Sequence, residues 1–461
     1  MTHAESLTSE ERKRFRLYAY AATWCGCFAE VMMENSAILL LFMTLLGSSE
    51  SQQMLSTSMN GIVSMLLMFF AAGLANRFGA KNAITGAVAI ELSSCLLIAS
   101  APFWGAANAT YVVLVGCFLF CVSRPVWTAS WYVVMGDILL PEERGSFLGF
   151  MRFSYYTITG ISFFLIGCAM GKEAPLWIPQ SVIAATGILA IGRAYFIRCI
   201  RLAKPEQGSG GPQLRIWSSL KETARNGRLV SFSIYVALMY LAFAPVLPLS
   251  IIYMKKYLAF GDGLVQILST TGIAGCVAAF LLYGTLQKRL GMARLQFLTH
   301  ALYISIPLAL AFCGNNLASL NAPLAWTIDL GWLGPGLSPL DLTAPILVYC
   351  MAGFTFVGCF ASATFGCIVS QETLALSPPG GVAMSSAFNQ TYVMIGTAIG
   401  RFGMSIILGA GVLSATWTLS GMEMSHFQTL FLLCAGVAAF ALFLLPSLPS
   451  FIPQQENWYK P

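Results

Sequence analysis

Twelve long apolar runs are the feature that most constrains what this chain can fold into. A helix of about 20 apolar residues crosses the roughly 30 Å of hydrocarbon in a bilayer. Membrane-spanning strands are about 10 residues long and alternate in polarity, whereas these runs are longer and continuous. The runs lie at 17–46, 53–75, 82–101, 108–134, 146–170, 176–198, 229–254, 263–286, 294–313, 343–370, 382–411 and 426–446. They predict an all-α polytopic membrane protein with twelve transmembrane helices.

Composition excludes the alternative of a soluble protein with a large core. Hydrophobic residues make up 57% of the chain, charged residues 10%, and the mean hydropathy is +0.74. A soluble domain carries about 25% charged residues, so this chain lacks the polar surface that water requires. The net charge of +6 indicates cytoplasmic loops of a membrane protein rather than a nucleic-acid partner. Most cysteines lie inside apolar runs, where a thiol behaves as a small hydrophobe, and we expect no metal and no cofactor.

The apolar runs divide into two groups of six around one polar stretch. Residues 199–228 are rich in glycine and charge and are expected to form a cytoplasmic linker. We therefore predict a six-helix bundle at 1–198, a second bundle at 229–446 and a cytoplasmic tail at 447–461. With the N-terminus inside, the inner segments collect 18 lysines and arginines against 3 in the outer segments. This bias places both termini in the cytoplasm.

Two short stretches recur in the two groups. "AAGLANRFGAK" (71–81) and "YGTLQKRLGMAR" (283–294) place Arg77 opposite Arg289 and Gly79 opposite Gly291. "ILLPEERGSFLG" (138–149) and "LALSPPGGVAMSS" (374–386) form a second pair, with Gly145 opposite Gly381. The second pair is spaced more widely because the long outer segment 314–341 lies between the two later stretches. The repeat predicts that the two bundles are related by a pseudo-two-fold axis.

The chain resembles the major facilitator superfamily in this 6 + 6 arrangement and in the loop motifs "GLANRFGAK" and "DILLPEERGSFLG". The resemblance covers nearly the whole chain. It implies two bundles that rock about a substrate site at the membrane midplane, with the first, fourth, seventh and tenth helices facing the cavity.

The loop motifs also predict gating residues. In that superfamily an Asp usually stands where this chain has Asn76 and Lys288, so the charge that helps close the cytoplasmic side is missing here. The glycines permit a tight turn, and the basic residues are expected at the inner interface. The predicted gating residues are Gly73, Asn76, Arg77, Gly79, Lys81, Arg144, Gly145, Arg289 and Gly291.

Glu30 and Glu34 are the most unusual residues of the first run. They are four positions apart, so they share one face of a helix, with Asn35 beside them. At about 1.5 Å per residue they lie roughly 20 and 26 Å from the inner end of the run. A charge at that depth costs about 3 kcal/mol on insertion scales, so it usually faces water or a partner. We predict that both acids face the cavity, with Glu30 the first choice for a proton-coupling residue.

Several basic residues also lie within apolar runs. Arg124, which precedes Pro125 in the fourth run, is expected near mid-depth as a substrate contact or as the partner of the acids. Arg152 and Arg401 are candidates for the substrate site, and a purely structural role is an equal alternative for each. Arg193 lies near the inner end of its run and is predicted to extend toward the membrane surface. For Glu91 we favour structural pairing.

The second group lacks deep acids, and its candidates for the cavity are polar or aromatic. They are Tyr235, Tyr240, Phe243, Tyr349, Phe356, Asn389 and Gln390, of which Tyr240, Asn389 and Gln390 are the site candidates carried forward. Aromatic residues at such spacing are more often packing residues than ligand contacts. His300 is predicted to be a packed residue.

These features predict a monomeric secondary active transporter in the cell membrane that moves a small polar or anionic organic solute by alternating access. Proton-coupled symport fits the buried acids, because a carboxylate changes its proton affinity when its surroundings switch between dry and charge-paired. An efflux antiporter of the same fold and a non-transporting membrane sensor or receptor stay open as alternatives. A membrane-embedded enzyme is disfavoured, because the three histidines lie in the tail or near the ends of runs.

Overall fold

The computed structural model describes residues 7–140, 143–202, 221, 223–314, 318–324, 327–328, 340–341, 343–377, 382–419 and 421–448. The first half of the chain forms the N-half. Its elements are α2 (Ser9–Asn35), α3 (Ile38–Leu45), α4 (Glu50–Phe78), α5 (Ala80–Ser100), the short η1 (Ala101–Trp104), α6 (Ala106–Ile138), α7 (Arg144–Met170) and α8 (Trp177–Cys199).

The second half of the chain forms the C-half. Its helices are α10 (Gly227–Phe243), α11 (Val246–Lys256), α12 (Asp262–Leu290), α13 (Met292–Phe312), α14 (Ile346–Leu376), α15 (Val382–Ala410) and α16 (His426–Ala441), with the short η3 (Ala318–Asn321) and η4 (Leu442–Ser447). Its strands are β1 (Pro323–Leu324), β2 (Thr327–Ile328), β3 (Leu340–Asp341), β4 (Ala344–Pro345), β5 (Thr416–Leu419) and β6 (Met422–Ser425). They pair as antiparallel ladders β1–β4, β2–β3 and β5–β6.

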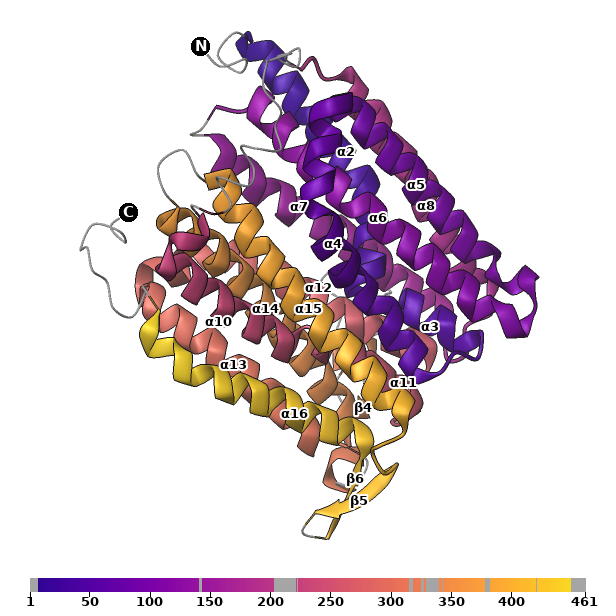
Figure 1. Cartoon of the computed structure of the whole chain (residues 1–461). Coiled ribbons are helices and arrows are strands. Elements are labelled where there is room, and N and C mark those ends of the chain that lie inside the picture. The colour runs from indigo at the N-terminus through magenta and orange to yellow at the C-terminus, as the bar shows by residue number, and fades with distance from the viewer. Residues whose placement is uncertain are drawn as a thin grey trace.

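The two halves are bundles of helices that lie side by side (Figure 1). The main packing between them is α4 against α15 and α7 against α12. We call the end of the helices where α2 begins and α8 ends the linker side, and the opposite end, where β5 and β6 lie, the hairpin side. The predicted all-helical membrane fold is confirmed, while the boundaries of the two bundles and the linker stay predictions.

Ten helices in the described residues are long and apolar enough to cross a membrane. The pair α2 and α3, bent by 54° at a short break, adds an eleventh if it counts as one span. Helix α4 covers the second expected span but is not among these ten. The count of twelve therefore stays a prediction.

Local sequence explains where several helices begin and end. Capping boxes start α2 at Thr8 with Glu11, α4 at Ser49 with Gln52, and α16 at Ser425 with Gln428. Gly79 separates α4 from α5 with a φ of 79°, and Gly291 separates α12 from α13 with a φ of 77°. Residues other than glycine rarely adopt this backbone conformation. The glycine of each repeated motif therefore allows the same tight turn in both halves.

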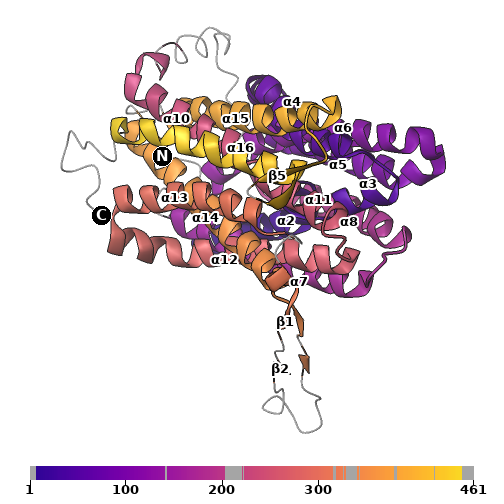
Figure 2. The same cartoon turned by 90° about the horizontal axis from the view of Figure 1, so that it is seen from below.

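The glycine, proline and tryptophan residues of the outer segment 314–341 predict either a folded cap over the outer mouth or a passive loop. Its described strands β1 and β2 extend away from the helices (Figure 2), and the choice between cap and loop stays a prediction. Its expected cap residues Trp326, Trp332, Pro335 and Pro339 lie outside the described residues.

Candidate functional site

The first span is broken directly after Glu34. Helix α2 ends at Asn35, Ser36 is extended (φ −126°, ψ 154°), and α3 begins at Ile38. The break leaves backbone groups without helical partners. The Ser36 hydroxyl accepts a hydrogen bond from Ile38 N at 3.1 Å, and Ala37 N donates to Ser269 Oγ of the C-half at 3.3 Å. One backbone N–H group at the break is therefore hydrogen-bonded by the other half of the molecule.

The seventh span is interrupted at Ala244 and Pro245, between α10 and α11. Ala244 O would accept a hydrogen bond from residue 248 in a continuous helix, but that residue is proline and has no N–H. Arg401 Nε of α15 donates to this carbonyl at 3.0 Å. Arg401 Nη1 also donates to Thr57 O of α4, in the N-half, at 2.9 Å.

Buried charges inside the N-half form one connected network. Arg124 Nη1 lies 2.6 Å from Glu30 Oε1, and Arg124 Nη2 lies 3.5 Å from Glu34 Oε1. Glu30 also pairs with Arg193, whose Nη1 lies 3.2 Å from Glu91 Oε2. Three carboxylates thus share two guanidiniums in the interior of the bundle.

Arg193 links Glu30 to Glu91 within this network. Its side chain is 1% exposed, and its guanidinium lies 4.1 Å from the centre of the Trp127 ring. The prediction that Arg193 extends to the membrane surface is wrong, because the face of α8 that carries it packs against α2 and α5. The predicted pairing of Glu91 is confirmed. Gly26 explains how the guanidinium fits, since a Cβ there would lie 1.8 Å from Arg193 atoms.

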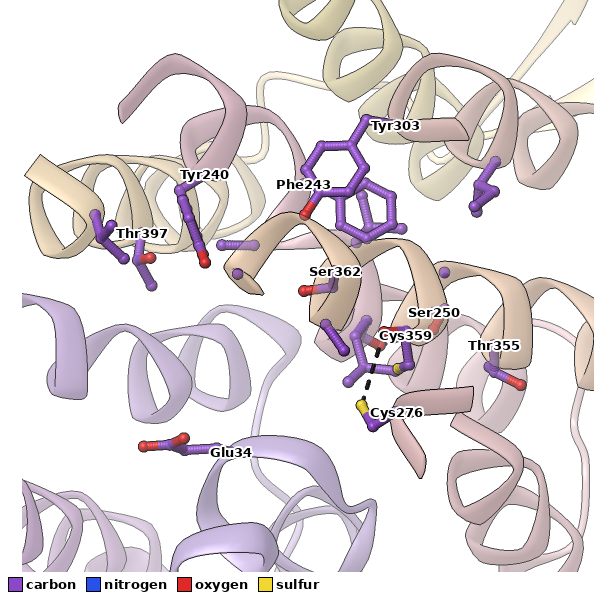
Figure 3. A pocket seen from close by; sticks show the side chains of 18 of the residues that line it. Glu34, Tyr240, Phe243, Ser250, Cys276, Tyr303, Thr355, Cys359, Ser362 and Thr397 are labelled. Carbon is purple, nitrogen blue, oxygen red and sulfur yellow. Dashed lines mark hydrogen bonds between the residues drawn. The ribbon is translucent and has the colours of Figure 1, made fainter. Parts of the chain in front are cut away.

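Between the two halves lies a cavity of about 380 Å³, within the range of small-molecule sites. Figure 3 shows Glu34 on the N-half facing Tyr240, Phe243, Ser362 and Thr397 on the C-half. Among the described residues, the charged ones that line it are Glu34, Arg152 and Arg401, which together carry one more positive than negative charge. Its walls are otherwise aromatic, apolar, thiol, hydroxyl and amide groups.

The structure brings six of the sequence candidates to this cavity. They are Glu34, Arg152, Tyr240, Phe243, Gln390 and Arg401. Glu30 and Arg124 lie behind Glu34 in the charge network rather than on the described lining. Asn389 is buried and donates to Thr373 Oγ1 at 2.9 Å. The side chain of Asn35 lies outside the described residues.

Sequence reasoning missed other lining residues. Asn60 of α4 donates to Glu34 Oε1 at 2.9 Å, and Tyr156 and Phe280 face each other across the halves with ring centres 5.6 Å apart. Arg152 lies 5.6 Å from the centre of the same Phe280 ring. Asn60 is a polar residue within an apolar run, and this alone could have indicated a cavity residue. No local sequence feature distinguishes Tyr156 or Phe280 from packing residues.

The predicted gating residues are only partly described. Arg77 and Arg289 lie exposed in the last turns of α4 and α12, beside the two turn glycines Gly79 and Gly291. Lys81 Nζ donates to Arg198 O within the N-half at 3.2 Å. The side chains of Asn76 and Arg144 lie outside the described residues, and for Gly73 and Gly145 only the helical backbone is described. Their gating role stays a prediction.

The halves are joined on the hairpin side by several polar contacts. Ser405 Oγ donates to Ser51 O at 2.7 Å, and Lys256 Nζ donates to Ser48 O at 3.1 Å. His426 Nε2 lies 2.9 Å from Glu50 Oε2. We call these contacts, with those of Asp262 and Gly263 to residues 171–174, the hairpin-side closure.

Comparison with solved structures identifies the fold. The chain is similar to a D-xylose–proton symporter (12% identity, 95% of this chain and 98% of that one, TM-score 0.68). It is also similar to the nucleoside transporter NupG (12%, 95% and 98%, 0.63) and to a bacterial homologue of the iron transporter ferroportin in an inward-facing state (10%, 95% and 98%, 0.62). No family model and no curated protein matches the sequence.

Proposed function

We infer the function of this chain from its site and from its fold, which over nearly its full length is that of the major facilitator superfamily transporters. From this fold and this site, we propose that the protein is a secondary active transporter that moves a small polar or anionic organic solute by alternating access. The observation that carries the proposal is the cavity between the halves, which takes charged side chains from both of them. A site built from two bundles changes its access when the bundles rock against each other.

The hairpin-side closure supports an inward-facing state. If the basic linker side is cytoplasmic, as the charge bias predicts, the contacts between the halves close the cavity from the outside. Two arginines against one carboxylate on the lining favour a solute that carries negative charge. The solved structures with this fold include symporters of neutral sugars, so the solute class rests on the lining of this chain.

Glu34 is our candidate for the coupling proton. It lies on the cavity wall, and it is linked through Arg124 to Glu30. Among the three acids and two arginines of the network, Glu34 is the acid that also lines the cavity, where a solute and a proton can both reach it.

Uptake into proteoliposomes tests the proposal. A panel of small carboxylates, phosphates and neutral solutes is first ranked by the shift in melting temperature that each gives to the purified protein. We expect at least one anionic solute from this ranking to accumulate in proteoliposomes when a pH gradient is imposed, and not in protein-free liposomes. Ligand binding without any uptake would instead identify a membrane sensor of the same fold.

A further inference from the structure

Arg401 lines the cavity and also connects the two halves through its hydrogen bonds. Its guanidinium lines the cavity, while Nη1 donates to Thr57 O of the N-half and Nε donates to Ala244 O of the C-half. We call this arrangement the Arg401 bridge. We propose, resting on the transport function above, that an anionic group of the substrate draws Arg401 away from Thr57 and thereby weakens the hairpin-side closure.

The acceptors of the Arg401 bridge are neutral carbonyl groups. Among the ion pairs of the described residues, none involves Arg401, and the nearest cavity acid, Glu34, already accepts from Asn60 and Arg124. A carboxylate or phosphate forms shorter and stronger bonds with a guanidinium than a carbonyl does, and it can take two parallel N–H groups. An anion in the cavity therefore competes well for Arg401.

The two hydrogen bonds of the Arg401 bridge are not equivalent. Pro248 cannot donate to Ala244 O, so this carbonyl depends on Arg401 for its hydrogen bond. Thr57 O lies inside the continuous helix α4, where the N–H of Gly61 is available to it. Breaking the Thr57 bond leaves no buried orphan group, whereas breaking the Ala244 bond does. The anion thus releases the bond between the halves and leaves the bond within the C-half.

The Thr57 bond lies where α4 and α15 approach each other closely. A Cβ on Gly61 of α4 would lie 2.8 Å from the backbone of Ala398, and one turn after Arg401 the Ser405 hydroxyl bonds to Ser51 O. Losing the Thr57 bond therefore loosens α4 against α15 on the hairpin side. Loss of the Thr57 bond thus links an occupied cavity to opening on the hairpin side. In alternating access, the substrate must bind the conformation that follows more tightly, so that it shifts the equilibrium toward it.

Hydrogen–deuterium exchange of the full-length protein in nanodiscs tests this link. The probes are acetate, benzoate, succinate and inorganic phosphate, with acetamide, benzamide and succinamide as uncharged counterparts. In the parent, at least one anion should speed exchange in peptides covering 46–57 and 401–412, while its amide should not. In Arg401→Gln, exchange there should be about tenfold faster without any probe, and no anion should change it further.

Two further variants separate the bridge from general weakening of the interface. Arg401→Lys keeps the charge but lacks the planar fork, so it should respond to anions with a smaller change. Ser405→Ala removes a neighbouring contact between the halves without changing charge, so it should exchange faster and still respond to anions. The proposal is overturned if Arg401→Gln exchanges and responds like the parent, if amides act as strongly as anions, or if no anion acts on the parent. Uptake is measured separately, so a parent that transports but fails this test refutes the bridge alone.

Discussion

At the scale of single residues, Arg193 determines how the acids of the N-half are tolerated. Its side chain is almost fully buried, and it bonds to Glu30 and Glu91 while stacking on Trp127. Removing one partner of a buried ion pair leaves an uncompensated charge, which costs more than the pair itself contributes. Arg193 is therefore a stabilising residue of the network, while Glu34 is the acid that faces the cavity.

Arg193→Ala should destabilise the protein strongly. Two carboxylates lose their shared guanidinium, and we expect a loss of about 3–5 kcal/mol in the free energy of unfolding. The matched control is Arg201→Ala, because Arg201 is 76% exposed and lies 3.8 Å from Glu11, a pair worth less than about 1 kcal/mol. Thermal denaturation in detergent compares the two. Equal melting temperatures would contradict the structural role of Arg193.

Residue types and depth predicted part of this site. A carboxylate pair on one helical face and an arginine at mid-depth were enough to single out Glu30, Glu34 and Arg124. Position along a run cannot show which face of the helix packs inward, and this is why Arg193 was misjudged. Pairing across helices depends on packing between segments far apart in sequence, as with Asn60 and Glu34.

At the scale of elements, the contact between α7 and α12 builds much of the hairpin-side closure. Gly263 N donates to Gly171 O at 2.8 Å, and Asp262 N donates to Lys172 O at 3.0 Å. A Cβ on Gly263 would lie 2.4 Å from Gly167 O and 2.6 Å from Gly171 O. Only glycine allows the two helices to approach this closely.

Gly263→Ala should force α7 and α12 apart on the hairpin side. Backbone atoms cannot yield as a flexible side chain does, so we expect the closure to weaken and the amides of 171–174 to exchange at least about threefold faster with deuterium. The control is Gly284→Ala in the same helix, where a Cβ would meet nothing within 4 Å. Unchanged exchange in Gly263→Ala would show that the closure does not depend on this contact.

The broken helices were predictable to different degrees. Pro245 and Pro248 mark the break between α10 and α11, because proline lacks the helical donor. The break after Glu34 contains no proline or glycine, and its Ala37 N–H is satisfied by Ser269 of the other half. Such a break depends on tertiary structure and could not be predicted from its own sequence.

At the scale of the whole molecule, the repeated motifs and the charge bias predict the same membrane topology. The turns at Gly79 and Gly291 have the same backbone conformation and lie on the linker side of each half. The apolar periodicity and the repeat were sufficient to predict the fold class, which similarity to solved transporters confirms. The strand ladders in 314–345 and 416–425 had no strong local signal, because each strand is only a few residues long.

The linker side should face the cytoplasm. A cysteine placed at position 209 of a variant whose native exposed cysteines, Cys168 and Cys199, are replaced by serine should react with a membrane-impermeant maleimide only after permeabilisation of whole cells. A second variant with the cysteine at position 420, between β5 and β6 in the sequence, serves as the control that reacts from outside. Labelling of position 209 in intact cells would invert the assignment of the two sides.

The central claim, transport by alternating access coupled through the cavity acid, is tested most directly by comparing two fluxes in Glu34→Gln. Glutamine keeps the shape and the hydrogen bond from Asn60 but cannot carry an exchangeable proton. In proteoliposomes, the variant should lose accumulation driven by a pH gradient and keep exchange of substrate across the membrane, since exchange needs no net proton movement. Accumulation equal to that of the parent would contradict the role of Glu34, and the absence of both fluxes in the parent would contradict transport itself.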